Sequence, residues 1–399
     1  MTTRTPVHLR GALLASVVLT GCVAAARTPA DADVATRTAT ADADSALRAR
    51  LQLALDSFRV ASGFPGATLG VALADGRTLA LATGMSDTAR RVAMRPGDRL
   101  LSGSVGKTYV AAVALQLVEE GKLDLESPIS RYLGEEPWFG RLPNARDITV
   151  RQLMNHTSGL VRYEFQPAVA DVLRRDPHGT WTPERRLSYI LDTQAPFAAG
   201  QGWEYSDTNY IVLGMIIERL TGRPYYDELR RRILQPLGLR NTIPSDRRDL
   251  PGVVNGYAGP RNELGGYDAS LADGLLAINP QFEWTGGGIA STADDLARWA
   301  KLLYESRAFS ATMLARMVDG VPSKLGGNAR YGLGAIVRDA PELGPVWGHS
   351  GFFPGYATDM AYLPNLRVSA AIQVNATAPY PRGLGQFLLR VARIASGRE

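Results

Sequence analysis

The sequence predicts an α/β (α+β) fold with one antiparallel sheet, built from both ends of the chain and flanked by helices. Strand-like runs occur near both ends, whereas the middle of the chain is helical and irregular. The apolar run 109–118 predicts a buried helix between the first strands and that middle part. We therefore expect a sheet domain over 45–124 and 286–399, with a mostly helical inserted domain over 125–285.

Turn and cap signals justify the elements in chain order. Residues 45–60 are typical of an amphipathic helix, and Asp75-Gly76 is a hairpin signal between two short strands. Thr149 and Thr292 are expected to start helices, and Thr221-Gly222 to end one. The expected strands are 67–73, 78–83, 331–337, 346–349, 358–363 and 368–374, and a last helix is expected over 384–394.

The first residues indicate export. Arg4 and Arg10 precede the apolar run 11–19, which is too short to span a bilayer and is typical of a signal peptide. We expect this signal peptide over 1–21. Residues 22–44 contain few large apolar side chains and predict a flexible tether.

The end of that leader resembles a bacterial lipobox. It reads Leu19-Thr20-Gly21-Cys22, and Cys22 is the single cysteine of the chain. Cleavage before Cys22 would leave an acylated residue that holds the protein on a membrane surface, with no thiol left for a disulfide or for catalysis. Val23 follows Cys22, which by resemblance to Gram-negative lipoproteins allows export to the outer membrane. We expect a lipid-anchored protein at the periplasmic or cell-envelope face.

Composition excludes several classes of function. The net charge is +5 over 399 residues and no basic stripe occurs, so nucleic acid is not an expected partner. No His-Glu-x-x-His or other ligand spacing occurs, so no metal and no cofactor is expected. The chemistry must then come from the side chains themselves.

Ser104 and Lys107 lie three residues apart at the start of the predicted buried helix, where they share one face. The helix N-terminus favours negative charge that develops on Ser104. Burial would lower the pKa of Lys107 and make it a possible base. The chain has 44 Lys and Arg residues, of which four are Lys, and an Arg cannot be deprotonated in a protein. A lysine beside a serine is therefore a candidate for proton transfer, although a lone Ser-x-x-Lys is also an ordinary helix start.

Two other motifs nearly fit this stretch. A phosphate-binding loop would need glycine where Leu101 stands, and a nucleophile elbow would need glycine where Ser102 stands. A Ser-His-acid triad with the late His349 therefore stays as a rival interpretation.

Two later stretches add candidate groups. Tyr205 directly precedes a predicted helix, and beside a lysine its phenolate becomes accessible, although a tyrosine is also a common packing residue. In Trp347-Gly348-His349-Ser350-Gly351-Phe352 the glycines allow a substrate to approach the backbone closely. His349 could be a base, a donor to a substrate carboxylate, or a core histidine.

Taken together, Ser104-x-x-Lys107, Tyr205-x-Asp207 and His349-x-Gly351 resemble the three motifs of the penicillin-recognising serine hydrolases. The most similar branch holds class C β-lactamases, D-alanyl-D-alanine carboxypeptidases, D-aminopeptidases and esterases. The resemblance covers about residues 50–375 and implies a β-lactamase/transpeptidase-like fold. Its supporting phrases are Gly121-Lys122-Leu123-Asp124-Leu125, Leu153-Met154-Asn155-His156-Thr157-Ser158-Gly159-Leu160 and Gly287-Gly288-Ile289-Ala290-Ser291-Thr292.

The resemblance assigns roles. Ser104 would attack a carbonyl and form an acyl-enzyme, while Lys107 and Tyr205 share the proton transfer; a close pair titrates as a unit, so which is the base stays open. The backbone N–H groups of Ser104 and Phe352 would form the oxyanion hole. Ser350 and its strand, with Gly351, would line the substrate.

Two departures from the motifs bear on the substrate. Asp207 stands where the family more often has asparagine; an ionised carboxylate cannot donate to a substrate carbonyl, so Asp207 would hold Lys107 or shape the loop. His349 stands where class C β-lactamases have lysine, and a neutral imidazole attracts a carboxylate less strongly. Both favour a peptidase or esterase over an efficient β-lactamase. His156 and His178 are interpreted as structural and loop residues.

The sequence thus predicts a serine hydrolase that acts through an acyl-enzyme on D-amino-acid peptides, in the manner of a D,D-carboxypeptidase, or on small esters and amides. The first alternative is a class C-type β-lactamase that hydrolyses β-lactams. The second is a non-catalytic lipoprotein that binds peptidoglycan.

Overall fold

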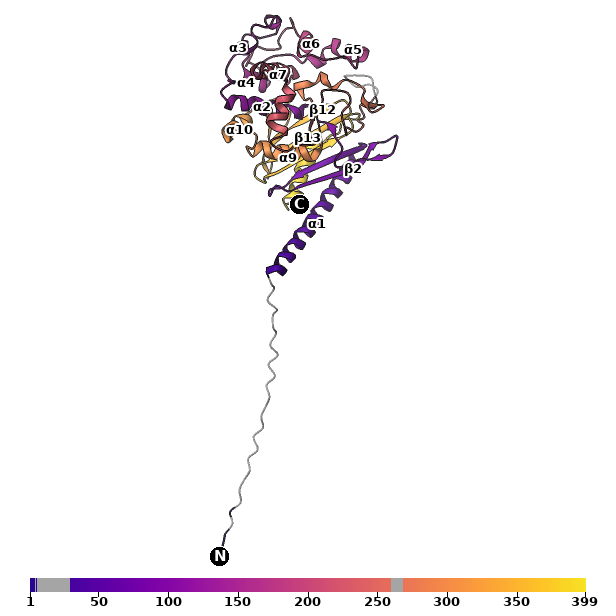
Figure 1. Ribbon diagram of the computed structural model, residues 1–399, viewed down its shortest axis with the longest axis vertical. Coiled ribbons are helices and arrows are strands. Elements are labelled where there is room, and N and C mark those ends of the chain that lie inside the picture. The colour runs from indigo at the N-terminus through magenta and orange to yellow at the C-terminus, as the bar shows by residue number, and fades with distance from the viewer. Residues whose placement is uncertain (4, 6–28, 260–267) are drawn as a thin grey trace. The chain divides into compact units, whose positions relative to one another are not determined.

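A computed structural model describes residues 1–3, 5, 29–259 and 268–399 (Figure 1). Contacts divide the chain into two units, 1–46 and 47–399, and every described strand belongs to the second unit. The predicted signal peptide lies outside the described residues except for 1–3 and 5, and Cys22 lies outside them entirely. None of the helices in the described ranges is long and apolar enough to cross a membrane.

The helix expected over 45–60 is longer than predicted. Helix α1 runs Pro29–Ser62, so most of the segment expected as a flexible tether is helical. Proline at the first helical position and the many alanines that follow favour this extension.

One antiparallel sheet forms the centre of the 47–399 unit, in the order β3-β2-β1-β14-β13-β12-β11-β10-β9. Its central neighbours come from opposite ends of the chain: β1 (Gly66–Ala72) pairs with β14 (Val368–Val374), and Ala67 faces Val374. The prediction of a sheet built from both ends is therefore confirmed. The other strands are β2 (Thr78–Asp87), β3 (Val92–Ala93), β9 (Val321–Pro322), β10 (Arg330–Tyr331), β11 (Ile336–Ala340), β12 (Gly344–Phe353) and β13 (Tyr356–Leu363).

The prediction of one strand over 331–337 is wrong, because this stretch forms parts of two strands, β10 and β11. The chain reverses after Tyr331, and Tyr331 of β10 pairs with Ile336 of β11. The Gly332 N–H donates to the Ala335 carbonyl at 2.8 Å and closes the turn. Two glycines around Leu333 permit this tight reversal, which an apolar run alone does not reveal.

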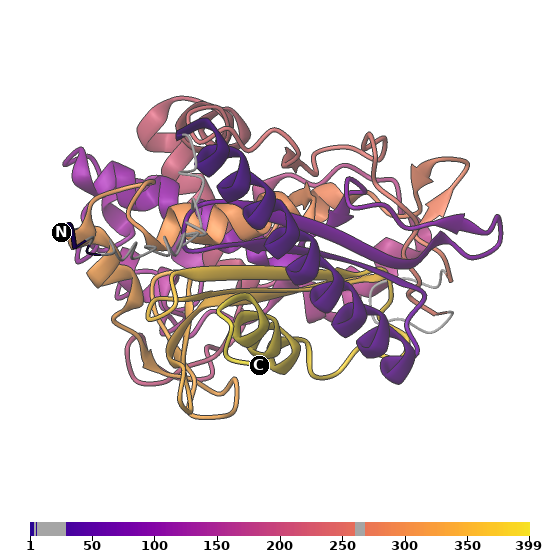
Figure 2. The ribbon, with the colours of Figure 1, turned by 90° about the horizontal axis from the view of Figure 1, so that it is seen from below.

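Helices cover both faces of the sheet. On one face α11 (Leu384–Ala395) packs against β13 and β14 (Figure 2), and its Phe387 ring stacks on Phe58 of α1 with centroids 4.4 Å apart. On the other face α9 (Ala293–Tyr304) crosses β1 and β14. The buried helix α2 (Lys107–Glu119) belongs to the core on this second face, as its apolar run predicts. The second face is therefore the one that carries the motifs.

The described part of 125–285 is mostly helix and loop. Its helices are α3 (Ser130–Leu133), α4 (Val150–Met154), α5 (Pro167–Arg175), α6 (Pro183–Ser188), α7 (Asp207–Thr221) and α8 (Tyr225–Leu229), and its strands are β5 (Ile243–Pro244), β6 (Leu271–Ala272) and β7 (Leu275–Leu276). A small sheet joins β5 through β8 (Ile289–Ser291) to β4 (Leu100–Leu101), directly before the Ser104 stretch. Helix α10 (Ala311–Val318) follows α9.

The predicted caps are confirmed. Thr149 forms a capping box with Gln152 at the start of α4, and Thr292 accepts the Asp295 N–H at 3.2 Å at the start of α9. Helix α7 ends at Gly222, whose φ of +66° is a left-handed conformation that glycine adopts at low cost. These local signals fix the starts and ends of the helices that bring the candidate residues together.

Candidate active site

Ser104 lies in a short 3-10 helix, Gly103–Gly106, that continues into α2. Gly103 has φ of +52°, and a Cβ there would lie 2.5 Å from the backbone nitrogen of Phe352. A Cβ on Gly351 would collide with the Ser102 carbonyl and lie 3.3 Å from the Ser104 nitrogen. The two glycines therefore let the end of β12 approach the serine, which brings together the backbones expected to form the oxyanion hole.

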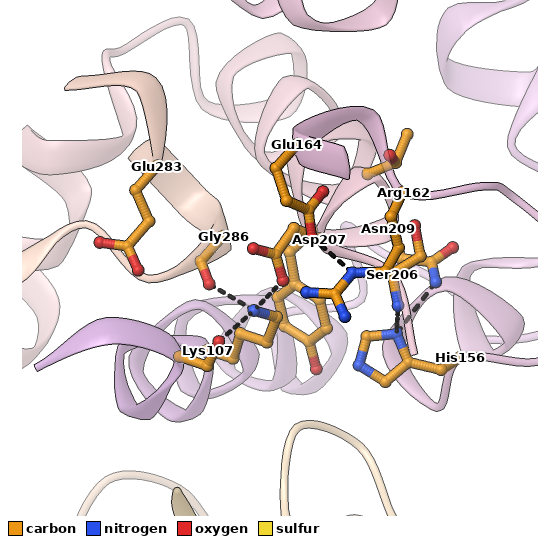
Figure 3. A network of polar contacts seen from close by, with 12 residues as sticks. Lys107, His156, Arg162, Glu164, Ser206, Asp207, Asn209, Glu283 and Gly286 are labelled. Carbon is orange, nitrogen blue, oxygen red and sulfur yellow. Dashed lines mark hydrogen bonds and ion pairs between the residues drawn. The ribbon is translucent and has the colours of Figure 1, made fainter. Parts of the chain in front are cut away.

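Lys107 is fully buried and donates three hydrogen bonds (Figure 3). Its Nζ lies 3.0 Å from Ser104 Oγ and 2.5 Å from Asp207 Oδ1, and it also donates to the Gly286 carbonyl. A lysine ammonium has three N–H donors and no acceptor. Every donor of Lys107 is therefore committed, one of them to the candidate nucleophile.

The pKa of Lys107 differs from the sequence-based expectation. Burial does lower it, but the charge of Asp207 and then Tyr205 outweigh burial, and the net pKa is raised above the ordinary lysine value. Asp207 is well placed for this role because it is the first residue of α7, where the helix dipole favours a carboxylate. The prediction of a lowered pKa is wrong, because it took no account of a partner 100 positions away in the chain.

Tyr205 completes the group just ahead of α7. The Lys107 Nζ lies 4.9 Å from the centre of its ring. Its buried Oη makes no hydrogen bond with any residue that the structure describes. Burial raises the pKa of Tyr205, and the nearby Lys107 acts in the opposite direction without cancelling the shift. Within the described ranges, Tyr205 Oη is thus one of the buried polar atoms of this region without a hydrogen-bond partner, together with His156 Nε2 and Glu164 Oε2.

His156 holds the backbone on both sides of Tyr205. Its carbonyl accepts the Glu204 N–H at 3.1 Å, and its Nδ1 accepts the Ser206 N–H at 3.3 Å. Asn209 also donates to Nδ1, at 3.0 Å, and the imidazole ring lies 4.3 Å from the Tyr205 ring. Burial lowers the pKa of His156 well below its usual value, so the ring is neutral and acts as a scaffold.

His349 is buried and neutral, and it does not contact the serine. Its Nδ1 donates to the Ser350 carbonyl at 2.6 Å, so its Nε2 accepts from the Tyr331 hydroxyl at 2.8 Å. Burial, followed by the charge of Lys107, lowers its pKa to about 3. Neither ring nitrogen is left for Ser104 or for a substrate carboxylate, so this geometry does not support a Ser-His-acid triad.

Three charged residues of the site were not singled out from the sequence. Arg162 donates through Nε to Glu164 Oε1 at 2.7 Å, and its guanidinium lies 5.5 Å from the centre of the Tyr205 ring. Glu283 accepts the Gly288 N–H at 3.0 Å. Burial, followed by the charge of Asp207, raises the pKa of Glu164 to about 7 and that of Glu283 to about 8. Arg162 and Glu164 lie two positions apart in one segment and Glu283 lies about 120 positions later, and neither place carries a motif, so no sequence signal could have found them.

The structure therefore brings Ser104, Lys107, Tyr205 and Asp207 into one cluster beside the end of β12. Gly351 contributes backbone there, and the centre of the His349 ring lies 6.3 Å from that of the Tyr205 ring. Ser350 lies between Gly351 and His349 in β12. Among the described residues, no group of three or more His, Cys, Asp or Glu side chains could hold a metal ion.

Comparisons with known proteins agree with this arrangement. Penicillin-binding protein 4* of Bacillus subtilis is 29% identical over 264 residues, which cover 64% of this chain and 56% of that protein. A D-aminopeptidase of Brucella anthropi is 27% identical over 338 residues, covering 84% of this chain and 59% of that protein. The chain thus spans less than three fifths of the length of these two relatives.

Two solved structures match this chain over nearly the whole of their own length. A D-stereospecific amidohydrolase from Streptomyces sp. has 29% identity and a TM-score of 0.74, with 86% of this chain and 98% of that chain covered. D-amino acid amidase from Ochrobactrum anthropi has 25% identity and a TM-score of 0.76, with 88% and 99% covered. These likenesses confirm the predicted fold class. The family model described as Beta-lactamase matches residues 43–392, and the chain therefore belongs to the beta-lactamase family.

Proposed function

We propose that this chain is a serine hydrolase that acts through an acyl-enzyme on peptides and amides of D-amino acids. The observation that carries the proposal is the contact between Ser104 Oγ and the buried Lys107 ammonium, with the unbonded Tyr205 hydroxyl beside them. A nucleophile, a cation and a proton-exchanging group are the parts that covalent acyl transfer needs. The preference for D-amino acids is supported by the names of the aminopeptidase, amidohydrolase and amidase that resemble this chain.

The contacts suggest how the proton moves. Lys107 donates to Ser104 Oγ, so the serine's own proton is free to pass to Tyr205 Oη as Oγ attacks the carbonyl carbon. The reactive form of Tyr205 is the phenolate, which the Lys107 charge stabilises. Tyr205 then returns the proton to the leaving amine, and the acyl-enzyme is left as an ester of Ser104. Water attacks this ester in the second half-reaction, which runs through the same groups in reverse.

We further propose that the protein is exported and held on the cell envelope by a lipid at Cys22. The support is the sequence: a basic start, a short apolar run, the lipobox-like residues 19–22 and a single cysteine. An anchored enzyme of this kind would face cell-wall peptides, which contain D-amino acids.

The substrate proposal is tested with D-alaninamide, D-alanyl-D-alanine, a 4-nitrophenyl ester and a penicillin. We expect hydrolysis of the D-configured compounds and little hydrolysis of their L-isomers. We also expect Ser104→Ala and Lys107→Ala each to reduce kcat/KM by at least ~1000-fold, because the nucleophile and the charge that supports it act as a unit. Rates follow from amine or nitrophenol release, and intact mass should show an acyl group on Ser104.

Other results would select the alternatives. Ring-opened penicillin as the main product would favour a β-lactamase. Muropeptide binding without turnover of any compound would favour a non-catalytic binding protein. Ester hydrolysis that survives Lys107→Ala but not His349→Ala would favour the Ser-His-acid triad.

The proton-transfer scheme predicts the pH dependence of Asp207→Asn. The charge of Asp207 raises the pKa of both Lys107 and Tyr205. Its removal lowers both values, so whichever group is the base loses its proton at lower pH. We expect the acid limb of the kcat/KM profile on a neutral ester to move to lower pH by about 1–3 units. An unmoved limb, or one matched by the exposed control Asp171→Asn, would contradict the scheme.

The anchor is tested by Cys22→Ser in the full chain, expressed in a Gram-negative bacterium fed with labelled palmitate. We expect the wild-type protein to carry label and sediment with membranes, and the variant to lose both properties because it has no thiol to acylate. Label retained by Cys22→Ser, or a wild-type protein without label, would overturn this proposal.

A further inference from the structure

Five charged side chains of the cluster around Tyr205 differ in how far they are exposed to solvent. Lys107 is 0% exposed and Asp207 13%, whereas the side chain of Arg162 is 34% exposed. The two glutamates, Glu164 and Glu283, are each 4% exposed. Among these five side chains, the Arg162 guanidinium is therefore the one most accessible to a substrate.

The side chains of Lys107 and His349 have no donor left for a substrate. All three donors of Lys107 are used within the protein, and both ring nitrogens of His349 are used as well. Arg162 uses Nε for Glu164, but neither of its Nη groups donates a hydrogen bond to any residue in the described ranges. Its two outer nitrogens are therefore the charged donors of this cluster that are left for a ligand.

The guanidinium is also held in place. Glu164 fixes Nε at 2.7 Å, and the Phe165 ring lies beneath the guanidinium with its centre 4.1 Å from Cζ. The guanidinium Cζ also lies 5.5 Å from the centre of the Tyr205 ring, and the Lys107 Nζ lies 4.9 Å from the centre of the same ring. A planar fork that is fixed in advance loses little entropy when it binds, and it matches the geometry of a carboxylate.

We propose that Arg162 binds a carboxylate of the substrate and so directs the enzyme toward peptides with a free carboxyl group, in preference to their uncharged amides. This inference rests on the proposed function and names its substrate class. The competing explanation is that Arg162 only neutralises Glu164 and Asp207 and supports the loop.

The test compares substrates that share one scissile bond. They are D-alanyl-D-alanine and D-alanyl-D-alaninamide, each as the free amine and as the N-acetyl derivative. We expect the wild-type enzyme to have the higher kcat/KM on the acid of each pair. Arg162→Gln should lower kcat/KM for the acids by roughly 10- to 100-fold, mainly through KM, because a charge-assisted hydrogen bond is lost. The amides should lose less kcat/KM than the acids, so that the acid-to-amide ratio falls, and Arg162→Lys should give a ratio in between.

Arg174→Gln is the matched control, because Arg174 is an exposed arginine of the same helical region, paired with Asp171 at 2.8 Å. It should leave the acid-to-amide ratio unchanged. An equal loss on acids and amides in Arg162→Gln would identify a positioning role and overturn the inference.

If that variant does not fold, competitive inhibition of the wild-type enzyme decides: N-acetyl-D-alanine must inhibit more strongly than its amide. Turnover of none of the four peptides would instead contradict the proposed function.

Discussion

The buried ammonium of Lys107 is the group on which the site depends. A charge that is removed from water must be paired and hydrogen-bonded, or it costs several kcal/mol. Three segments meet that need: the 3-10 helix with Ser104, the start of α7 with Asp207 and a second 3-10 helix, Trp284–Gly286, before β8. Losing any one of them would leave part of the charge unsatisfied. The same contacts that keep the lysine buried therefore also set the position of Ser104, the proposed nucleophile.

The sheet supplies the frame for this pairing. Strands β1 and β14, from the early and late parts of the chain, are neighbours in it. Strand β12 lies two strands from β14, with its end beside the Ser104 segment. The helical region supplies the opposite wall through α7 and the segment that holds Arg162. The charge of Asp207 in this wall keeps Lys107 protonated. Burial, followed by the same charge, raises the pKa of Glu283 to about 8 and favours its neutral form. Among Lys107, Asp207, Glu164, Glu283 and Arg162, the Arg162 side chain is the most exposed.

Local patterns predicted much of this structure because they report local physics. The Thr149 and Thr292 caps and the Gly222 stop follow from side-chain chemistry within a few residues, and the apolar run after Lys107 predicted a buried helix. The order of the three motifs predicted which residues gather. What the sequence could not show depends on contacts between distant segments: the raised pKa of Lys107, the fully committed ring of His349, and the Arg162–Glu164 pair. Each of these depends on how many partners surround one buried group, and periodicity carries no information on that.

The central claim is that Asp207 keeps Lys107 an ammonium in the folded protein, and NMR tests it most directly. The chain has four lysines, so a spectrum of labelled lysine Cε and Nζ atoms is simple, and Lys107→Arg assigns the signal of interest. The account predicts that the Lys107 signal keeps its ammonium shift to higher pH than the value of about 10.4 at which an ordinary lysine titrates. A Lys107 signal that titrates below that value would contradict it, and would make Lys107 a neutral base at rest.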